Sequence, residues 1–349
     1  MNQTLLPANA RVLLVRLSAL GDVVLTLPLV NALLAKGVRL TWLIERKFLP
    51  VVAHLADRVN LLPIDSPRRV ADYRAILTAL SAHHFDVLLA AQAKLRINVL
   101  YPFIKADLKL GFDTRRAKDL HGLFVNARIP RADHHLADGL LAFAGYFGIA
   151  EGDPDYAPPV DAEAARWCRE QIGGGDYVLL NPTSSKAERD WPLKRQTEFV
   201  TRLRETGWSG RLVVAGGPAA RDVEWAGEIA KASGNACNLA GQTTLPRLFA
   251  LIAGAKVLVS PDSGPVHIAT AYGVPVVGLY AVARAALSGP WRHTEFCVDV
   301  YDQAMKQLSG KDPARADWHA RVHDGHAMAL ISVDQALEAT RRALAASVR

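Results

Sequence analysis

The chain has 349 residues, of which half are hydrophobic and 21% are charged, a balance typical of a globular protein with two domains rather than one. Its formal charge of +7 favours a polyanion or an acidic membrane surface as a partner, although an inert basic surface explains the same total. The three cysteines, Cys168, Cys237 and Cys297, lie far apart. Their number and spacing exclude a disulfide framework and an ordinary zinc site, and they fit a reducing compartment.

Residues 1–30 combine an apolar run with three charged residues inside it, Arg11, Arg16 and Asp22. A signal peptide or a membrane span would exclude such charges from its apolar part. We therefore expect a cytoplasmic protein, with any membrane contact being peripheral.

The elements of the first half alternate between strands and helices. Residues 11–17 are predicted to form a buried strand, and residues 18–22 a turn into a helix that reaches about residue 34 and bends or restarts at Pro28. Further strands are predicted at residues 38–44 and 85–91, with a helix at 70–83. Continuous apolar runs of this kind are typical of parallel strands joined by crossover helices.

Residues 151–161 interrupt this alternation with three prolines and one glycine among acidic residues, and they are the best linker candidate in the chain. The pattern then restarts. Helices are predicted at 162–172, 196–206, 245–253, 266–272 and 332–346, and strands at 177–180, 211–215, 257–259 and 276–280. The predicted domains are residues 1–155 and 156–331, followed by a closing C-terminal helix within 332–349.

The predicted fold class is α/β, with two Rossmann-like, doubly wound parallel-sheet domains that face a cleft. Ligands of such sheets bind at the carboxyl ends of the strands. Two polar turns fall at such ends, Gly21-Asp22 in the first half and Asp262-Ser263-Gly264 in the second.

The second of these turns has the composition of an anion site. The start of a helix offers free N–H groups and a partial positive charge, Pro265 suits its first turn, and Gly264 allows a close approach to the backbone. No GxGxxG follows the first strand and no GxxxxGK[ST] occurs, which disfavours a nicotinamide oxidoreductase and excludes a P-loop. Pro261 occupies the position of the first glycine of a GxSxG elbow, which weakens a hydrolase interpretation.

Two long stretches resemble a known family. The run RVLLVRLSALGDVVLTLPLVNALL, residues 11–34, resembles the opening of the lipopolysaccharide heptosyltransferases, which are GT-B glycosyltransferases. The run LAGQTTLPRLFALIAGAKVLVSPDSGPVHIATAYGVPVVGLY, residues 239–280, resembles their second signature. Shorter similarities (LKLGFDTRRAKDLHGLFVNARIP, HHLADGLLAF, AGGP and MALISVDQAL) extend the resemblance through nearly the whole chain.

The resemblance implies an inverting transfer of heptose from ADP-heptose to a lipopolysaccharide core or lipid A precursor, with Asp22 as the general base. An acid that complements a helix start is the alternative role for Asp22. The first domain would bind the acceptor and the second the nucleotide sugar. The inner face of the inner membrane is an expected surface of contact, and no nucleic acid is expected. No metal is required, although Mg²⁺ is compatible with the arrangement.

On the donor side, the resemblance assigns the diphosphate to Ser263 and Gly264. We expect Asp262 to order the turn or to accept a hydrogen bond, because a second anion would repel phosphate. Arg189 stands where the family commonly has Lys. The full set of predicted donor-binding residues is Thr183, Ser184, Lys186, Arg189, Gly216, Asp262, Ser263, Gly264 and His267.

On the acceptor side, nine Lys and Arg stand against four Asp between residues 86 and 131, which predicts a docking surface for an acidic ligand. A solvated face explains any single one of these cations equally well. His135 and Asp138 are either structural or on the acceptor side. The predicted acceptor-binding residues are Arg68, Arg69, Lys94, Arg96, Arg115, Arg116 and Lys118.

Two departures from the family pattern leave alternatives open. Arg284 falls where the family has Asp, so a different nucleotide-sugar donor remains an alternative. A non-catalytic nucleotide-binding protein of envelope assembly is a separate alternative. The late histidines His319, His323 and His326 suggest a metal site, but a polar helix or loop is favoured because neither a carboxylate nor a cysteine completes the set.

Overall fold

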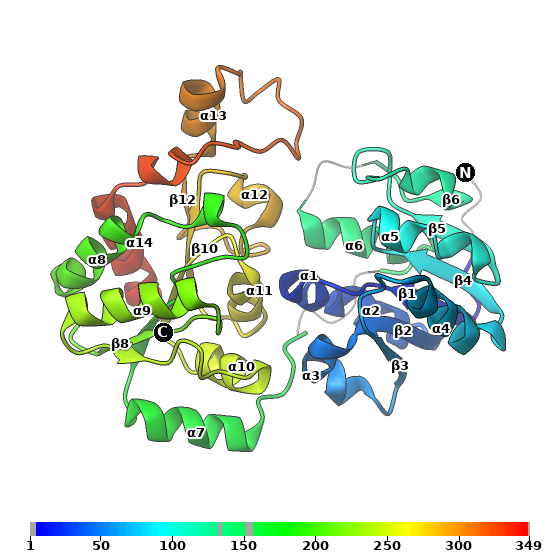
Figure 1. The fold of residues 1–349 in the computed structure, drawn as a ribbon, viewed down its shortest axis with the longest axis horizontal. Coiled ribbons are helices and arrows are strands. Elements are labelled where there is room, and N and C mark those ends of the chain that lie inside the picture. Colours follow the sequence, from blue (N-terminus) through cyan, green and yellow to red (C-terminus); the bar gives the residue numbers. More distant parts are fainter. Residues whose placement is uncertain (1–4, 132–134, 151–155, 348–349) are drawn as a thin grey trace. The chain divides into compact units, whose positions relative to one another are not determined.

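Two parallel β-sheets, each covered by helices, make up the computed structural model, which describes residues 5–131, 135–150 and 156–347 (Figure 1). The chain divides into two units, Met1–Pro158 and Pro159–Arg349. The predicted α/β class with two Rossmann-like sheets is confirmed. The division falls three residues after the predicted boundary, and residues 151–155 of the predicted linker lie outside the described residues.

The first unit contains a six-stranded sheet in the order β3-β2-β1-β4-β5-β6. Strand β1 is paired with β2 on one side and with β4 on the other, so the strand order reverses between β1 and β4. The last four residues of β1 are buried, as a strand covered on both faces requires. The strand bounds are β1 Arg11–Val15, β2 Arg39–Glu45, β3 Val59–Ile64, β4 Phe85–Ala90, β5 Ala106–Gly111 and β6 Ala127–Arg128.

Helices cover this sheet between successive strands. The predicted restart at Pro28 is confirmed, since the first helical stretch ends at Val24 and Pro28 lies in the first turn of the next helix, where its missing N–H costs no hydrogen bond. The helix bounds are α1 Leu20–Val24, α2 Leu27–Ala35, α3 Leu49–Val52, α4 Val70–Ser81, α5 Leu95–Asn98 and α6 Leu136–Gly145.

The second unit repeats the arrangement with the strand order β12-β11-β10-β7-β8-β9, so its reversal lies between β7 and β10. The strands are β7 Tyr177–Leu180, β8 Arg211–Val214, β9 Cys237–Asn238, β10 Val257–Pro261, β11 Val276–Tyr280 and β12 Val298–Asp299. The helices are α7 Ala162–Ile172, α8 Leu193–Arg202, α9 Ala220–Ser233, α10 Leu245–Ala253, α11 Gly264–Ala271, α12 Ala285–Ser288, α13 Tyr301–Ser309 and α14 Val333–Ala346.

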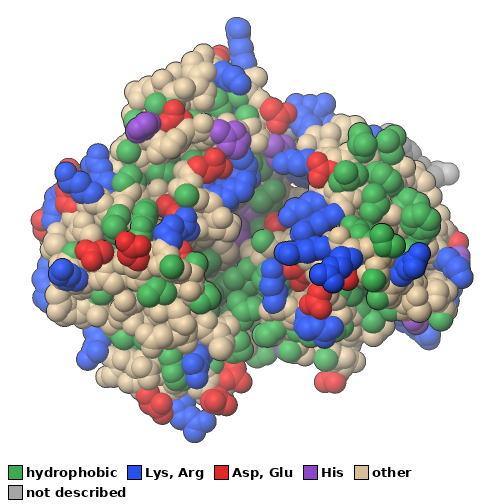
Figure 2. Space-filling view, viewed as in Figure 1, with side chains coloured by type: hydrophobic (Ala, Val, Ile, Leu, Met, Phe, Trp, Pro, Cys, Tyr) green, Lys and Arg blue, Asp and Glu red, His purple; other side chains and the backbone are tan. Residues whose placement is uncertain are grey.

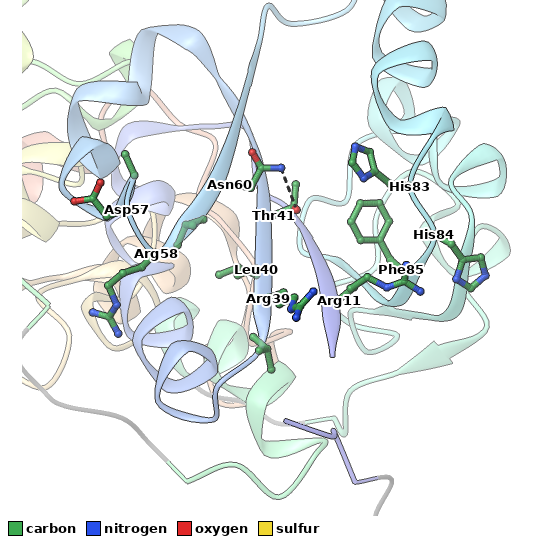
Figure 3. Close-up of a pocket in the computed structure, with 13 residues that line it drawn as sticks. Arg11, Arg39, Leu40, Thr41, Asp57, Arg58, Asn60, His83, His84 and Phe85 are labelled. Atoms are coloured by element: carbon green, nitrogen blue, oxygen red, sulfur yellow. Dashed lines mark hydrogen bonds between the residues drawn. The ribbon is translucent and has the colours of Figure 1, made fainter. Parts of the chain in front are cut away.

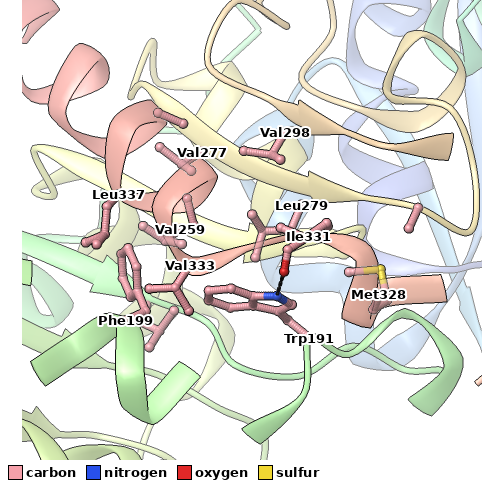
Figure 4. Packing of buried hydrophobic residues seen from close by; sticks show 14 of the residues in the cluster. Trp191, Phe199, Val259, Val277, Leu279, Val298, Met328, Ile331, Val333 and Leu337 are labelled. Atoms are coloured by element: carbon pink, nitrogen blue, oxygen red, sulfur yellow. Dashed lines mark hydrogen bonds between the residues drawn. The ribbon is translucent and has the colours of Figure 1, made fainter. Parts of the chain in front are cut away.

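The closing helix α14 begins at a reciprocal cap, in which the Ser332 hydroxyl accepts from the Gln335 N–H and the Gln335 side chain accepts from the Ser332 N–H. Just before it, the indole N–H of Trp191 donates to the Ile331 carbonyl at 3.1 Å (Figure 4). Trp191 is fully buried, and its ring meets Phe199 edge-on. The closing helix is therefore part of the core of the second unit.

Residues 311–326 form turns and loops, so the favoured loop interpretation of the late histidines is confirmed. Within the described chain, no three His, Cys, Asp or Glu side chains are grouped as metal ligands. Among those same residues, no helix is both long and apolar enough to cross a bilayer.

His121 fixes the segment after β5 onto α5. Its ring is fully buried, with Nδ1 2.9 Å from Asn98 Oδ1, and Nε2 accepts the Phe112 N–H at 3.2 Å. Because Nε2 accepts, the ring is neutral and its Nδ1–H donates to Asn98. Burial, assisted by the charge of Arg128, lowers the pKa of His121 to about 4.

We expect this histidine to make the first unit sensitive to acid. The unfolded chain takes up a proton near pH 6.5, whereas folded His121 resists protonation until about pH 4. Its stabilisation is therefore complete above pH 6.5 and lost as the pH falls towards 4. The stability advantage of the wild type over His121→Gln should shrink by up to about 3 kcal/mol between pH 7 and pH 4, as measured by calorimetry. An advantage that is constant over this range would contradict the assignment.

Candidate active site

The strand-order reversal of the first sheet brings together the segments that follow β1 and β4. The N–H groups of Leu17 and Ser18 donate to Gln92 Oε1 at 2.8 and 3.3 Å, and Arg16 Nη1 donates to the Ala91 carbonyl at 2.6 Å. These bonds connect positions about 75 residues apart in the chain. They fix the turn that carries the predicted base.

Asp22 is the third residue of α1, and its carboxylate is held from two sides. Oδ1 lies 2.6 Å from Arg16 Nη2, and Oδ2 accepts the Ala19 N–H at 3.0 Å. The side chain remains 32% exposed, whereas that of Arg16 is only 12% exposed. Asp22 thus complements a helix start, as its alternative role required, and is still accessible and oriented. Sequence reasoning missed Arg16 as the residue that positions it.

The reversal of the second sheet lies where β7 and β10 end, and it contains the predicted anion site. Ser263 occupies the N-cap position of α11, yet its side chain makes no capping bond. The hydroxyl lies 2.8 Å from Ser260 Oγ and accepts from Asn181 Nδ2 at 3.2 Å, while the same amide donates to Ser260 Oγ at 3.0 Å. Asn181, at the end of β7, therefore keeps the Ser263 hydroxyl turned away from the helix start. An uncapped helix start suits an incoming anion.

Arg189 and Asp262 form an ion pair beside this helix start. Arg189 Nη1 lies 3.1 Å from Asp262 Oδ2, and the two side chains are only 15% and 10% exposed. The expectation that Asp262 orders the turn is consistent with this contact. The pair also keeps the guanidinium close to the place predicted for the diphosphate.

The loop between β7 and α8 is held by a second set of buried polar contacts. The Ser184 N–H donates to Asp190 Oδ1 at 2.6 Å, and the Thr183 hydroxyl donates to Asp222 Oδ1 at 2.9 Å. Arg221 pairs with Asp190 at 3.0 Å and donates to the Ser184 carbonyl at 2.7 Å. Burial raises the pKa of Asp190, a shift opposed by the Ser184 N–H and Arg221.

Thr183 and Ser184 therefore hold the loop between β7 and α8 in place. The Ser184 hydroxyl adds a further bond, which it donates to the Lys186 carbonyl. The Lys186 side chain itself is exposed. Gly216 permits close packing, because a Cβ there would come within 3.1 Å of Ala240 Cβ. His267 is buried within α11. Direct contact of any of these residues with a donor stays a prediction.

The predicted acceptor residues separate into two groups. Arg68, Arg69, Lys94, Arg96 and Lys118 are exposed, and none of the five forms an ion pair with another described residue. The remaining two, in the turn after β5, are less accessible.

Arg116 does not belong to that exposed surface, and the prediction for it is corrected. Its side chain is 6% exposed and pairs with Asp113 at 2.6 Å, and it packs so closely on α6 that a Cβ at Gly139 would meet its Nε. The ion pair lies within the turn after β5, and the packing of the Arg116 side chain on Gly139 joins that turn to α6. Arg115 is half-buried, and His135 caps α6 through Nδ1, which accepts the Ala137 N–H.

Arg284, the departure from the family pattern, also has a structural role. Its guanidinium lies 4.5 Å from the ring of Tyr301 and 5.3 Å from that of Trp318, and it donates to the Pro313 carbonyl. The side chain is only 14% exposed. Arg284 therefore fixes the 313–318 loop. Local sequence patterns do not predict this contact, because the two segments lie about thirty residues apart.

A pocket of about 520 Å³ lies at the opposite edge of the first sheet, where β1 to β4 begin (Figure 3). Arg11, Arg39, Arg58, His83 and His84 contribute to its lining. Because it lies at the amino ends of the strands, it contains none of the predicted site residues.

The role of the hydrogen bonds that Asn181 donates to Ser260 and Ser263 can be tested without a substrate. We expect Asn181→Ala to lower the stability of the second unit by about 1–3 kcal/mol, because the buried Ser260 hydroxyl and the partly buried Ser263 hydroxyl lose a donor. It should also weaken the binding of inorganic pyrophosphate about fivefold, since Ser263 becomes free to cap α11. Thr340→Val removes another buried hydroxyl bond, in α14, and serves as the matched control. Equal pyrophosphate affinity of the two variants in calorimetric titrations would contradict this role.

Comparison with known proteins agrees with this geometry. The profile of glycosyltransferase family 9 (heptosyltransferase) matches residues 73–316. The chain is 30% identical over 326 residues to the lipopolysaccharide core heptosyltransferase OpsX of Haemophilus influenzae, covering 92% of this chain and 93% of that protein.

Solved structures have the same fold. A family 9 glycosyltransferase from Veillonella parvula superposes with a TM-score of 0.78 at 20% identity, covering 97% of this chain and 98% of the other. The Escherichia coli heptosyltransferase WaaC, solved with ADP-2-deoxy-2-fluoro heptose, gives 0.67 at 22% identity, covering 95% and 99%. With a profile match over more than half of its length and a relative at 30% identity, this chain belongs to glycosyltransferase family 9, the heptosyltransferases.

Proposed function

We propose that this protein transfers a heptose from ADP-heptose to a lipopolysaccharide core acceptor by a single, inverting displacement. The observation that supports this most is the place of the two predicted groups within their own sheets. Asp22 and the start of α11 each lie at a strand-order reversal, where doubly wound sheets bind ligands. Membership of the heptosyltransferase family supplies the reaction class.

The second unit is proposed to bind the donor. The start of α11 carries a partial positive charge and no side-chain cap, so it suits the diphosphate of a nucleotide sugar. The relative WaaC was solved with an ADP-heptose analogue, which supports ADP-heptose as the donor here. Gly264 allows the phosphates to approach the backbone, and the loop after β7 closes the other side of this reversal.

Arg189 is proposed to stabilise the charge that develops on the leaving ADP. The guanidinium is already held near the helix start by Asp262, so little reorganisation is needed when the leaving group becomes more negative. Its planar fork binds phosphate oxygens in a way that the lysine common in the family cannot. Lys186, on the same loop, is the second candidate for this charge.

Asp22 is proposed to remove the proton from the acceptor hydroxyl as the hydroxyl oxygen attacks the anomeric carbon opposite the ADP. Arg16 and the Ala19 N–H orient the carboxylate, and about a third of the side chain is open to solvent. The reaction needs no metal in this form, and independence from Mg²⁺ stays a prediction.

The first unit is proposed to bind the acceptor. Exposed cations with no ion pair to another described residue are suited to the acidic groups of a lipopolysaccharide precursor. The residues of this kind retained for the role are Arg68, Arg69, Lys94, Arg96 and Lys118. Arg115, which is half-buried in the turn after β5, stays a predicted acceptor residue on the strength of the resemblance alone.

Replacing the base tests the mechanism. Asp22→Asn keeps the shape of the side chain, and we expect kcat to fall by about 10²–10⁴ while ADP affinity changes by no more than a few fold. Asp86→Asn is the control, because Asp86 also accepts a backbone N–H and pairs with an arginine, at the opposite edge of the sheet. Release of ADP from ADP-heptose in the presence of core acceptor measures turnover. A variant that keeps most of its turnover would remove Asp22 from the mechanism.

The choice of donor has its own test. We expect ADP to raise the thermal unfolding midpoint more than UDP or GDP at equal concentration, because a ligand stabilises the folded state in proportion to its affinity. A larger effect of UDP would favour another nucleotide-sugar donor. Nucleotide binding without release of ADP from any donor would favour the non-catalytic alternative. Arg284 is only 14% exposed, so its presence where the family has Asp is not by itself a reason to expect a different donor.

A further inference from the structure

Exposed apolar side chains gather on one part of the first unit. Eight large hydrophobic side chains are exposed among the described residues, and four of them come from residues 95–123. These are Leu95, Phe103, Leu120 and Leu123, with exposed fractions from 48% to 77%. Single exposed apolar residues are normal, whereas a gathered set indicates an interaction surface.

The segments that carry these side chains pack on one another. The Leu95 N–H donates to Asp119 Oδ2 at 3.1 Å, and Asn98 Nδ2 donates to the Asp119 carbonyl at 2.9 Å. The rings of Tyr101 and His121 meet edge-on at 5.8 Å. Residues 118–123 therefore lie against α5 and the 3₁₀ turn η3, Tyr101–Phe103, which follows it.

Helix α4 belongs to the same layer, because its buried residues share one hydrophobic cluster with those of α5 and η3. Its first residue, Val70, is 68% exposed. We call the combined face the α4–α5 surface; it comprises Arg68, Arg69, Val70, Lys94, Leu95, Arg96, Phe103, Lys105, Leu120, Leu123 and Lys118.

The backbone exposes Leu120 at a conformational cost. Asp119 and Leu120 have φ values of 54° and 61°, in the left-handed region that a bulky side chain rarely adopts. Asp119 is held by the bonds to α5, and the turn directs Leu120 outward with 66% of its surface exposed. Backbone strain of this kind concentrates at functional positions.

The charges beside these side chains are mainly positive. Arg68, Arg69, Lys94, Arg96 and Lys118 make no ion pair with another described residue. Two acids, Asp72 and Asp119, also lie here, and their carboxylates accept backbone N–H groups, Asp72 from Arg68 and Arg69 and Asp119 from Leu95. Figure 2 shows Lys and Arg side chains next to the hydrophobic ones on this unit.

We propose that the α4–α5 surface docks this protein on a bilayer that contains anionic phospholipid. Leucine and phenylalanine side chains enter the interface between headgroups and acyl chains, while long cationic side chains around them reach the phosphates. This combination favours a lipid surface over an acidic protein, which would leave the protruding apolar side chains exposed. The cations of this surface are also those proposed to bind the acceptor, but vesicle binding is measured without donor or acceptor, so the docking stands or fails independently of the proposed reaction.

Vesicle flotation of the full chain, without donor or acceptor, tests the proposal. We expect the protein to bind vesicles of phosphatidylcholine with 30% phosphatidylglycerol and not vesicles of phosphatidylcholine alone, with binding lost as salt shortens the range of the attraction. The double variant Lys94→Ser/Arg96→Ser should bind roughly 25-fold more weakly, from about fivefold for each cation. Leu123→Asp should lower binding at least about tenfold.

Each variant has a matched control in the same unit. Leu5 is 76% exposed, against 77% for Leu123, and it precedes β1, so Leu5→Asp should leave vesicle binding unchanged. Arg39→Ser/Arg58→Ser removes two exposed arginines from the pocket at the amino ends of the strands (Figure 3) and should also leave it unchanged. Both changes replace exposed side chains, as do the test variants, and calorimetry checks that all four chains fold.

The outcomes separate docking from its alternatives. Loss of binding in the α4–α5 variants alone supports the proposal. Equal losses in the controls, equal binding to neutral vesicles, or no vesicle binding by the wild type would overturn it. A dimer that Leu123→Asp dissociates in sedimentation, without vesicle binding, would assign the surface to self-association and would likewise overturn it.

Discussion

The reversal of strand order within each parallel sheet is the constraint on which the candidate site depends. At a reversal of strand order, the crossover connections that follow the two central strands lead in opposite directions. The segments just after these strands therefore meet at the carboxyl edge of the sheet, where no helix covers them. In the first sheet these segments contain Asp22, and in the second they lead into α11. Each polar turn is then fixed by a buried amide from the neighbouring strand end, Gln92 in one unit and Asn181 in the other. The two units thus use the same device to hold opposite charges, a carboxylate in one and a positive helix start in the other.

Each charge proposed to take part in the reaction is held by a partner of opposite sign. Arg16 orients Asp22, and Asp262 orients Arg189. Desolvating a charge without a partner is costly, so pairing lets both groups occupy partly buried positions. The pairing also fixes their directions before a ligand arrives, which is what electrostatic catalysis requires. Preorganisation here has a cost, because an incoming phosphate must share Arg189 with Asp262.

Local patterns in the sequence were sufficient for most of the fold. Apolar runs located the buried strands, and Pro28 and Ser332 marked helix starts through properties of single residues. Most of the contacts within the site were not predictable in this way. The partners Gln92 and Asn181 act across about 75 to 80 positions of the chain, and only folding brings such residues together. The prediction that Arg116 belongs to the exposed surface was wrong for a related reason. The sequence shows that a cation is present, but it does not show that Asp113, three residues earlier, holds the guanidinium in the interior.

Docking on lipid would also change the chemistry available to the first unit. An acceptor that is anchored in the same bilayer meets a docked protein at a high effective concentration, so weak individual contacts to its acidic groups become sufficient. Docking of this kind would account for the exposed cations and exposed apolar side chains around α4 and α5, in the same unit that carries Asp22 in α1. The cations would then have two roles, attraction to headgroups and recognition of the acceptor. The apolar side chains distinguish these two roles, because a sugar acceptor would not bind Leu123, whereas the apolar part of a membrane would.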